Sequence, residues 1–406
     1  ENFVSKPFWE IETLFREVKF RYDKGRFEDK TKADEVAAKI ATEEFEIVDF
    51  EKKKGKEYAP KLFDLTGLQV FCNKSFGLTA DQTLKIAQNL YERKLISYPR
   101  VDTNYLPNDQ HPKIAGIMKG LTKYSHFTSK ILAKPIKKTK RVFDDKKVTD
   151  HHAIIPTGQE ASLDVNQQKV YDSITKNFIA NFFPDCIVSN TTVFGKVIEY
   201  EFKAKGKEIL DLGWREVIPP SKSKSKRGDD DSKLIPVFAK GEKGPHTPTL
   251  LEKKTQAPKP FTEATLLRAM ETAGKKVDDE ELRELMKANG IGRPSTRANI
   301  IETLFKRQYI KRVRKNLQPT EVGIKLISVI DNPLLKSAEL TGQWERKLKE
   351  ISQGEYSPKS FINLMKQMCD SLVTEVRMSN RTDRISAPNA KKFTKAKVKP
   401  KAKAKK

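Results

Sequence analysis

The sequence has 406 residues, of which 79 are lysine or arginine and 54 are aspartate or glutamate, so the formal net charge is +25. Hydrophobic residues make up 37% of the chain, which is enough for a core in most segments but not in all of them. The surplus of positive charge favours a polyanionic partner, most often a nucleic acid, although solvated surface lysines would give the same count.

The three cysteines, Cys72, Cys186 and Cys369, are far apart and form no CxxC pair. This spacing argues against a zinc ribbon and against a disulfide framework, and it favours a reducing, cytoplasmic compartment. The sequence contains no apolar run of eighteen residues and no signal peptide, so we expect no membrane partner. Its first residue is glutamate rather than methionine, and we therefore expect a piece of a longer protein.

The elements expected in chain order begin with strands. Residues 1–65 alternate apolar and polar positions in short runs, which predicts strands. Thr79 is expected to cap a helix with an apolar face over residues 84–90, and residues 104–190 read as mainly helical. Residues 191–218 return to strand character.

The second half of the chain opens with a predicted break. Residues 219–233 are rich in serine, lysine and aspartate and predict a disordered loop, followed by a short strand over residues 234–239. Helices resume from Phe261, with Thr262 at a helix start and Glu263 in its first turn, where negative charge is favourable. Residues 391–406 contain nine lysines and predict a flexible polycation that contacts nucleic acid or merely solubilises the chain.

The segment LISYPRVDTNYLP, residues 95–107, places Tyr98, Arg100 and Asp102 at alternate positions. A tyrosine hydroxyl, with a pKa of about 10, attacks poorly unless its surroundings help it. A neighbouring guanidinium can hold a phosphate with paired donors and stabilise developing charge. The same pattern would also suit an ordinary strand end and turn with the Tyr98 ring packed on the core, so the local sequence leaves both interpretations open.

A histidine pair, His151 and His152, lies in the segment DHHAIIPT. Taken alone, the pair favours a loop end with hydrogen-bonded imidazoles. A metal site is disfavoured, because adjacent side chains rarely converge on one ion.

Four motifs occur in a fixed order: LISYPRVDT at 95–103, DHHAIIPT at 150–157, FTEATLLRAME at 261–271 and GIGRPSTRANIIETLFKRQYI at 290–310. The order of these motifs and their residues resemble those of the type IA DNA topoisomerases, and those of the bacterial topoisomerase III-like branch more than the others. The resemblance extends from residue 1 to about residue 370. Two departures, Val101 and Thr103 in place of the commoner threonine and serine, leave the tyrosine untouched.

The resemblance implies a role for each catalytic candidate. Tyr98 would attack a DNA phosphate and become joined to the 5′ end of the cut strand, and the free 3′ hydroxyl would later reseal it. Arg100 would position and stabilise the scissile phosphate. His151 would contact that phosphate or a nearby nucleotide, and His152 ranks second because other branches place a different residue there. Positioning and charge neutralisation are what phosphoryl transfer chiefly requires.

The resemblance also implies a single-strand-binding loop and helix start at residues 290–297. Gly290 and Gly292 would permit close backbone approach, and Ser295 and Thr296 would cap the following helix while its amides face a phosphate. The DNA-binding residues that we expect are His152, Asp102, Thr103, Arg293, Ser295, Thr296 and Arg297.

Relatives begin with a Toprim domain that holds a catalytic glutamate and an acidic cluster for Mg²⁺. Residues 1–60 contain no strand followed by DxD, so we interpret the chain as the part downstream of Toprim, with no metal site of its own. The expected activity of the full-length enzyme is ATP-independent cleavage of one DNA strand, strand passage and religation. A non-catalytic nucleic-acid clamp is the alternative. We expect a monomer that prefers single-stranded DNA, in the bacterial cytoplasm with nucleoid or plasmid DNA.

The expected fold is mixed α and β, mainly helical, an open torus with a discontinuous β-rich arch. The expected boundaries are 1–15 for the end of a helical base segment, 16–64 and 191–254 for the two halves of the arch, 65–190 for the helical domain with the nucleophile, 255–375 for the helical base and 376–406 for the tail.

Two other tyrosine enzymes fit the sequence less well. A tyrosine recombinase would need an arginine-HxxR-tyrosine set with the tyrosine near the C-terminus, whereas Tyr98 is early and follows no HxxR. A relaxase would need histidines alternating with an apolar residue to hold a metal, whereas His151 and His152 are adjacent.

Overall fold

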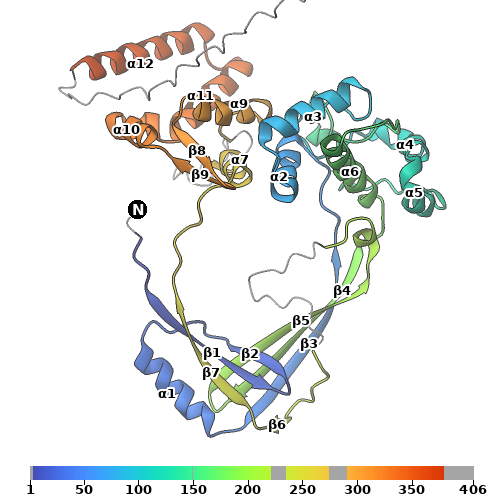
Figure 1. Cartoon of the computed structure of the whole chain (residues 1–406), viewed down its shortest axis with the longest axis vertical. Coiled ribbons are helices and arrows are strands. Elements are labelled where there is room, and N and C mark those ends of the chain that lie inside the picture. The colour runs from blue at the N-terminus through green and yellow to red at the C-terminus, as the bar shows by residue number, and fades with distance from the viewer. Residues whose placement is uncertain (1–2, 149, 221–234, 274–289, 379–406) are drawn as a thin grey trace, which may run out of the picture. The chain divides into compact units, whose positions relative to one another are not determined.

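The computed structural model describes residues 3–148, 150–220, 235–273 and 290–378. The chain divides into two compact units (Figure 1). Unit 1 contains residues 1–68 and 85–259, and unit 2 contains residues 69–84 and 260–406.

Unit 1 contains a seven-stranded sheet in the order β6-β3-β4-β5-β2-β1-β7, in which every pair is antiparallel (Figure 1). Its strands are β1 (Pro7–Phe15), β2 (Val18–Tyr22), β3 (Phe45–Glu57), β4 (Cys186–Val197), β5 (Tyr200–Asp211), β6 (Lys243–Gly244) and β7 (Thr247–Lys254). Three strands precede the helical segment and four follow it. The predicted mixed α and β fold with a discontinuous β-rich part is therefore confirmed.

The core of this sheet is aromatic. Phe15, Phe20, Phe45 and Phe202 are buried, and the rings of Phe20 and Phe45 lie 4.7 Å apart between centroids. Helix α1 (Lys30–Ala41) buries Ala33 and Ile40 and begins at an N-cap aspartate. The sequence interpretation missed α1, because its apolar residues are mostly alanines, which give a weak apolar face.

Three expectations for unit 1 were wrong. Residues 7–15 form strand β1, as the alternation over residues 1–65 predicted, but they belong to the sheet rather than to the end of a helical base, because the segment pairs with β2 and β7. The second group of strands begins at Cys186 rather than residue 191. Residues 235–239 form no strand, and the strands of that region are β6 and β7 instead. The predicted loop at 219–233 lies almost entirely outside the described residues.

The helical elements between β3 and β4 begin with α2 (Leu65–Phe76) and α3 (Ala80–Glu92), in which the chain passes between the two units. Thr79 caps α3 as predicted: its hydroxyl accepts from Gln82 N at 3.1 Å, and Gln82 Oε1 accepts from Thr79 N at 2.9 Å. The remaining elements of this part are η1 (Asn108–Lys113), α4 (Ile114–Gly120), η2 (Thr122–Tyr124), α5 (Ser125–Leu132), η3 (Asp145–Lys147) and α6 (Val165–Ala180), and η4 (Gly213–Glu216) follows β5.

Unit 2 is mainly helical, with one two-stranded antiparallel sheet. Its elements are α7 (Glu263–Glu271), α9 (Pro294–Lys306), β8 (Ile310–Val313), β9 (Asn316–Pro319), α10 (Glu321–Val329), η6 (Pro333–Lys336), α11 (Glu339–Ser352) and α12 (Pro358–Met378). Thr262 caps α7, as predicted. Helix α12 extends to Met378, so the tail does not begin at residue 376, and residues 379–406 lie outside the described part of the chain.

We predict that Gly195→Ala will destabilise unit 1 by about 1–3 kcal/mol, because a Cβ at this buried position of β4 would overlap the Phe45 ring. Thermal unfolding followed by circular dichroism measures the effect. Gly116→Ala is the matched control, since a Cβ there meets open space within α4, and it should be neutral or slightly stabilising. Equal stability of the two variants would contradict the packing described for the sheet.

Candidate functional site

Two short segments, far apart in sequence, form the base of the candidate site. Leu95–Ser97 pairs with residues 154–157: Ser97 N donates to Ile155 O at 2.9 Å, and Thr157 N donates to Leu95 O at 3.0 Å. The Thr157 hydroxyl donates to Lys94 O at 2.6 Å. Because the two segments run antiparallel, this pairing places Tyr98, which follows Ser97, beside His151 and His152, which precede Ala153.

Ser97 joins the two segments a second time through its side chain. Its hydroxyl donates to Ala153 O at 3.1 Å and accepts from Ile155 N at 2.9 Å. The entry into this segment is fixed by the end of α3, where Lys94 has a positive φ of 60° and its N–H donates to Tyr91 O at 2.8 Å. The backbone is therefore held on both sides of the turn that leads to Tyr98.

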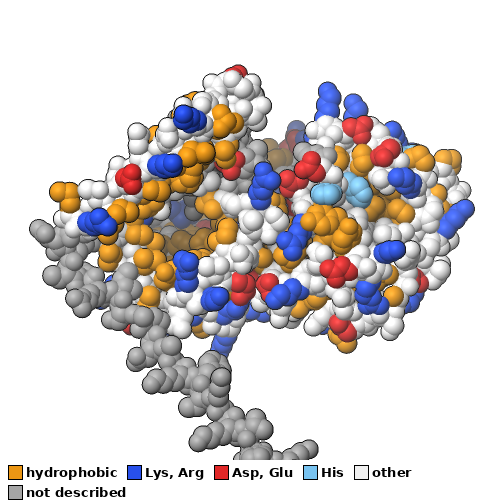
Figure 2. Space-filling model, turned by 90° about the horizontal axis from the view of Figure 1, so that it is seen from above, with side chains coloured by type: hydrophobic (Ala, Val, Ile, Leu, Met, Phe, Trp, Pro, Cys, Tyr) orange, Lys and Arg blue, Asp and Glu red, His pale blue; other side chains and the backbone are white. Residues whose placement is uncertain are grey.

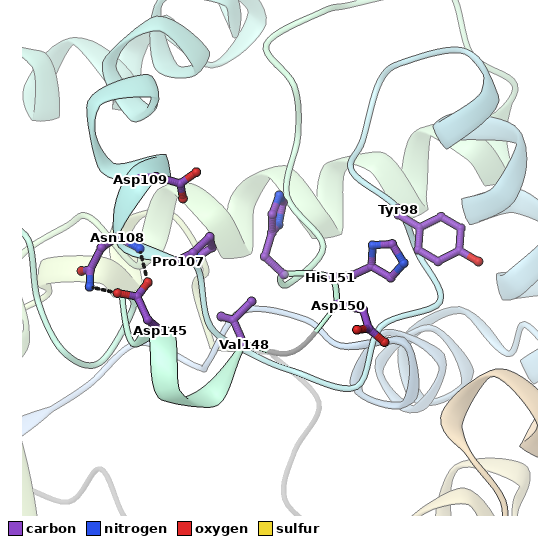
Figure 3. A pocket seen from close by; sticks show the side chains of 9 residues that line it. Tyr98, Pro107, Asn108, Asp109, Asp145, Val148, Asp150 and His151 are labelled. Carbon is purple, nitrogen blue, oxygen red and sulfur yellow. Dashed lines mark hydrogen bonds between the residues drawn. The ribbon is translucent and has the colours of Figure 1, made fainter. Parts of the chain in front are cut away.

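Tyr98 and His151 lie side by side. Their ring centroids are 4.6 Å apart with an angle of 48° between planes, and the Tyr91 ring packs edge-on to Tyr98 at 5.3 Å. Tyr98 is half-buried, whereas His151 is exposed. Figure 3 shows the phenol oxygen of Tyr98 on the side away from His151, so the imidazole contacts the ring and leaves the oxygen accessible.

Tyr98 and both histidines line one open pocket of about 550 Å³. Its other walls come from η1, from η3 and from the residues beside them (Figure 3). Asn108 N donates to Asp145 Oδ1 at 2.7 Å, and the Asn108 amide also bonds to Asp145, which joins η1 to η3. These bonds hold the pKa of Asp145 below its usual value, so its carboxylate stays ionised. Sequence reasoning missed the residues of this wall, and no pattern in the sequence marked them.

Exposed and buried side chains alternate over residues 99–103. Arg100 and Asp102 are exposed, whereas Pro99, Val101 and Thr103 are buried. This alternation is typical of extended backbone, and it puts the side chains of Arg100 and Asp102 on the solvent side of the segment. Neither side chain lines the pocket.

The buried Thr103 holds the segment in place. Its hydroxyl donates to Lys147 O at 2.5 Å and accepts from Tyr105 N at 3.3 Å. These bonds give Thr103 a structural role, and its contact with DNA stays a prediction.

In unit 2, the backbone conformation of residues 290–297 requires glycine at two positions. Gly290 and Gly292 have positive φ values of 63° and 71°, and a Cβ at Gly290 would clash with the backbone of Met270 and Glu271. Arg297 is buried, and its Nε donates to Gly292 O at 3.0 Å. Arg293 is exposed.

The predicted capping role of Ser295 and Thr296 was wrong. Arg293 is the N-cap of α9 and Pro294 occupies the first helical position, so Ser295 and Thr296 lie inside the first turn. The Thr296 hydroxyl donates back to Arg293 O at 2.9 Å.

Among the described residues, no group of three histidine, cysteine, aspartate or glutamate side chains is arranged to hold a metal ion. The Mg²⁺ that the resemblance implies therefore has no fitting donor set in the part of the chain that the structure describes, and we assign it no step here. No helix of that part is long and apolar enough to cross a membrane. Figure 2 shows lysine and arginine side chains spread over the face viewed, with acidic side chains between them.

Comparison with known proteins decides the family. A profile described as DNA topoisomerase matches residues 1–363. The chain belongs to this family. The resemblance to the type IA DNA topoisomerases is thereby confirmed.

Individual relatives agree with this family. DNA topoisomerase 3 of Bacillus cereus is 35% identical over 408 aligned residues, which cover 94% of this chain and 54% of the relative. DNA topoisomerase 3 of Bacillus subtilis is 35% identical over 348 residues, or 83% of this chain and 48% of the relative. The chain thus spans about half the length of the curated relatives it matches.

A solved structure shows the same fold. Full-length topoisomerase I from Thermotoga maritima superposes with a TM-score of 0.65 at 24% identity, covering 91% of this chain and 59% of that chain.

We predict that Ser97→Ala will destabilise unit 1 by about 1–3 kcal/mol, because it removes both side-chain bonds between the paired segments and leaves Ile155 N without its acceptor. Thermal unfolding measures the loss. Ser173→Ala is the control, since its hydroxyl bonds only within an exposed turn of α6, to Lys169 O. Equal stability of the two variants would show that the Ser97 hydroxyl does not join the segments.

Proposed function

We propose that this chain is the part of a type IA DNA topoisomerase that carries the nucleophile and binds single-stranded DNA. The observation that carries the proposal is the half-buried Tyr98 ring against His151 at the mouth of an open pocket, in a chain of this family. The phenol oxygen faces away from the histidine and is free to meet a phosphate (Figure 3).

In the proposed reaction, the Tyr98 oxygen attacks the phosphorus of one DNA strand. A bond forms between this oxygen and phosphorus, and the bond from phosphorus to the 3′ oxygen breaks. The phenol loses its proton and the leaving 3′ hydroxyl gains one. Attack by that hydroxyl on the phosphotyrosine reverses each change, so the energy of the diester is kept and no ATP is required.

Arg100 is the charge partner in this proposal. Tyr98 and Arg100 are two residues apart, Tyr98 is half-buried and Arg100 is exposed, so both side chains are accessible to one strand. A guanidinium offers paired donors to the phosphate oxygens as negative charge develops on them. We further propose that the full-length enzyme acts in the bacterial cytoplasm and that its Mg²⁺ is held by a Toprim domain.

The rival proposal, a non-catalytic clamp, shares the basic surplus but makes no use of Tyr98. A clamp would bind DNA equally well with any aromatic residue at position 98. The two proposals therefore differ in one measurable product, a covalent bond between DNA and Tyr98.

We predict that Tyr98→Phe, in the full-length protein with Mg²⁺, will abolish the covalent adduct with a labelled single-stranded oligonucleotide and leave its affinity within about twofold. The change deletes one oxygen and preserves the packing against Tyr91 and His151. Denaturing gels quantify the adduct, and peptide mapping locates it. Tyr91→Phe is the control, and an adduct that persists in Tyr98→Phe would end the assignment.

We predict that Arg100→Ala will slow cleavage by about 10²–10³-fold while weakening DNA binding far less, because the guanidinium acts mainly on the developing charge. His151→Ala should have a milder effect, and His152→Ala the mildest. Single-turnover cleavage and equilibrium binding are measured on the same oligonucleotide. An unchanged rate in Arg100→Ala would make that residue structural, and a larger loss from His152→Ala would reverse the order of the pair.

A further inference from the structure

Two lysine side chains converge on another tyrosine of unit 1, Tyr105. The Tyr105 hydroxyl oxygen accepts from Lys61 Nζ at 3.3 Å and from Lys147 Nζ at 3.2 Å. Both ammonium groups also lie against the Tyr105 ring, at 5.1 and 4.6 Å from its centroid. We call these three residues the Tyr105 cluster.

The Tyr105 cluster carries unbalanced positive charge. The pKa of Tyr105 is lowered, chiefly by its hydrogen bond from Lys147, yet a phenol is largely neutral near pH 7. Asp144 pairs with Lys147 at 3.4 Å, so one carboxylate faces two ammonium groups. Two ammonium groups on one oxygen repel each other, and an anion that bridged them would supply the missing charge.

Stability alone does not account for this arrangement. Lys61 and Lys147 are exposed, and exposed charge pairs contribute little to the free energy of unfolding. Fixing two long side chains at one point also costs conformational entropy. Each ammonium has three N–H donors. Lys147 gives one to Tyr105 and also pairs with Asp144, and both exposed lysines keep at least one donor for solvent or a ligand.

The Tyr105 cluster is close to the candidate site but distinct from it. Tyr105 O accepts from Ala153 N at 3.0 Å, and His151 is two residues before Ala153, a span of at most about 7 Å. Lys147 ends η3, whose Asp145 lines the pocket, whereas no member of the cluster does. An anion held at the cluster would therefore be a neighbour of the group that Tyr98 meets.

We propose that the Tyr105 cluster binds a backbone phosphate of single-stranded DNA next to the scissile phosphate and so fixes the strand relative to Tyr98. The proposal rests on the DNA-binding function proposed above. Lys61 and Lys147 supply the charge, and Tyr105 is a positioning residue that holds both ammonium groups within reach of one phosphate.

The double variant Lys61→Gln/Lys147→Gln tests the charge. On the 406-residue chain, we expect affinity for a labelled single-stranded oligonucleotide to fall about fivefold to tenfold at low salt. The slope of log affinity against log salt should become shallower by about 0.7 for one lost phosphate contact. Lys32→Gln/Lys39→Gln, two exposed lysines of α1, is the control with the same change in charge.

Tyr105→Phe tests the positioning role without changing the net charge. We expect a twofold to fivefold loss of affinity at low salt and, in the full-length protein, a less uniform cleavage position on a defined oligonucleotide. Affinity and cleavage pattern both equal to wild type would overturn the role of Tyr105.

Two further outcomes would overturn the proposal. The first is a double variant that loses no more affinity than the α1 control. The second is inorganic phosphate binding to the wild-type chain but not to the double variant, in calorimetry, while DNA affinity is unchanged, since the cluster would then hold a free anion. Failure of Tyr98 as nucleophile would leave these binding results unaffected, so the two proposals fail separately.

Discussion

The pairing of residues 95–97 with residues 153–157 is the constraint on which the candidate site depends. More than fifty residues separate the two segments, and the intervening chain forms α4, α5 and three short 3-10 helices, none of which would by itself bring Tyr98 and His151 together. Backbone bonds set the register, and the Ser97 hydroxyl bonds to both Ala153 and Ile155 within it. Because the register is fixed, the two rings meet at 4.6 Å without any direct bond between them.

Features with local causes could be predicted from the sequence. Thr79 and Thr262 cap helices because each hydroxyl bonds to a backbone amide only three residues ahead. The same reasoning failed at Ser295, because Pro294 fits the first helical position and moves the cap to Arg293. The proposed roles of Tyr98 and His151 came from the order of four motifs, because the spacing of single residues would not have indicated them.

Features with distant partners could not be predicted. Glu263 was interpreted as a favourable charge in the first turn of a helix. The structure also buries it, with its carboxylate accepting from Ala80 N at 2.9 Å and from Arg312 Nε at 2.7 Å. A buried carboxylate must be paired in this way to offset its desolvation. The strand character of residues 7–15 was predicted, but the segment was assigned to the wrong domain, since its partner β7 lies more than two hundred residues away.

The net charge of the whole chain is +25, but the charge around the candidate site is not uniformly positive. Asp109, Asp145 and Asp150 form an acidic wall of the pocket beside Tyr98, whereas the neighbouring Tyr105 cluster carries two ammonium groups. If the cluster binds a backbone phosphate as proposed, the acidic wall would disfavour a backbone that lay against Asp109 and Asp145. The two opposite charge environments would then orient the strand as well as hold it, which a uniformly basic surface could not do.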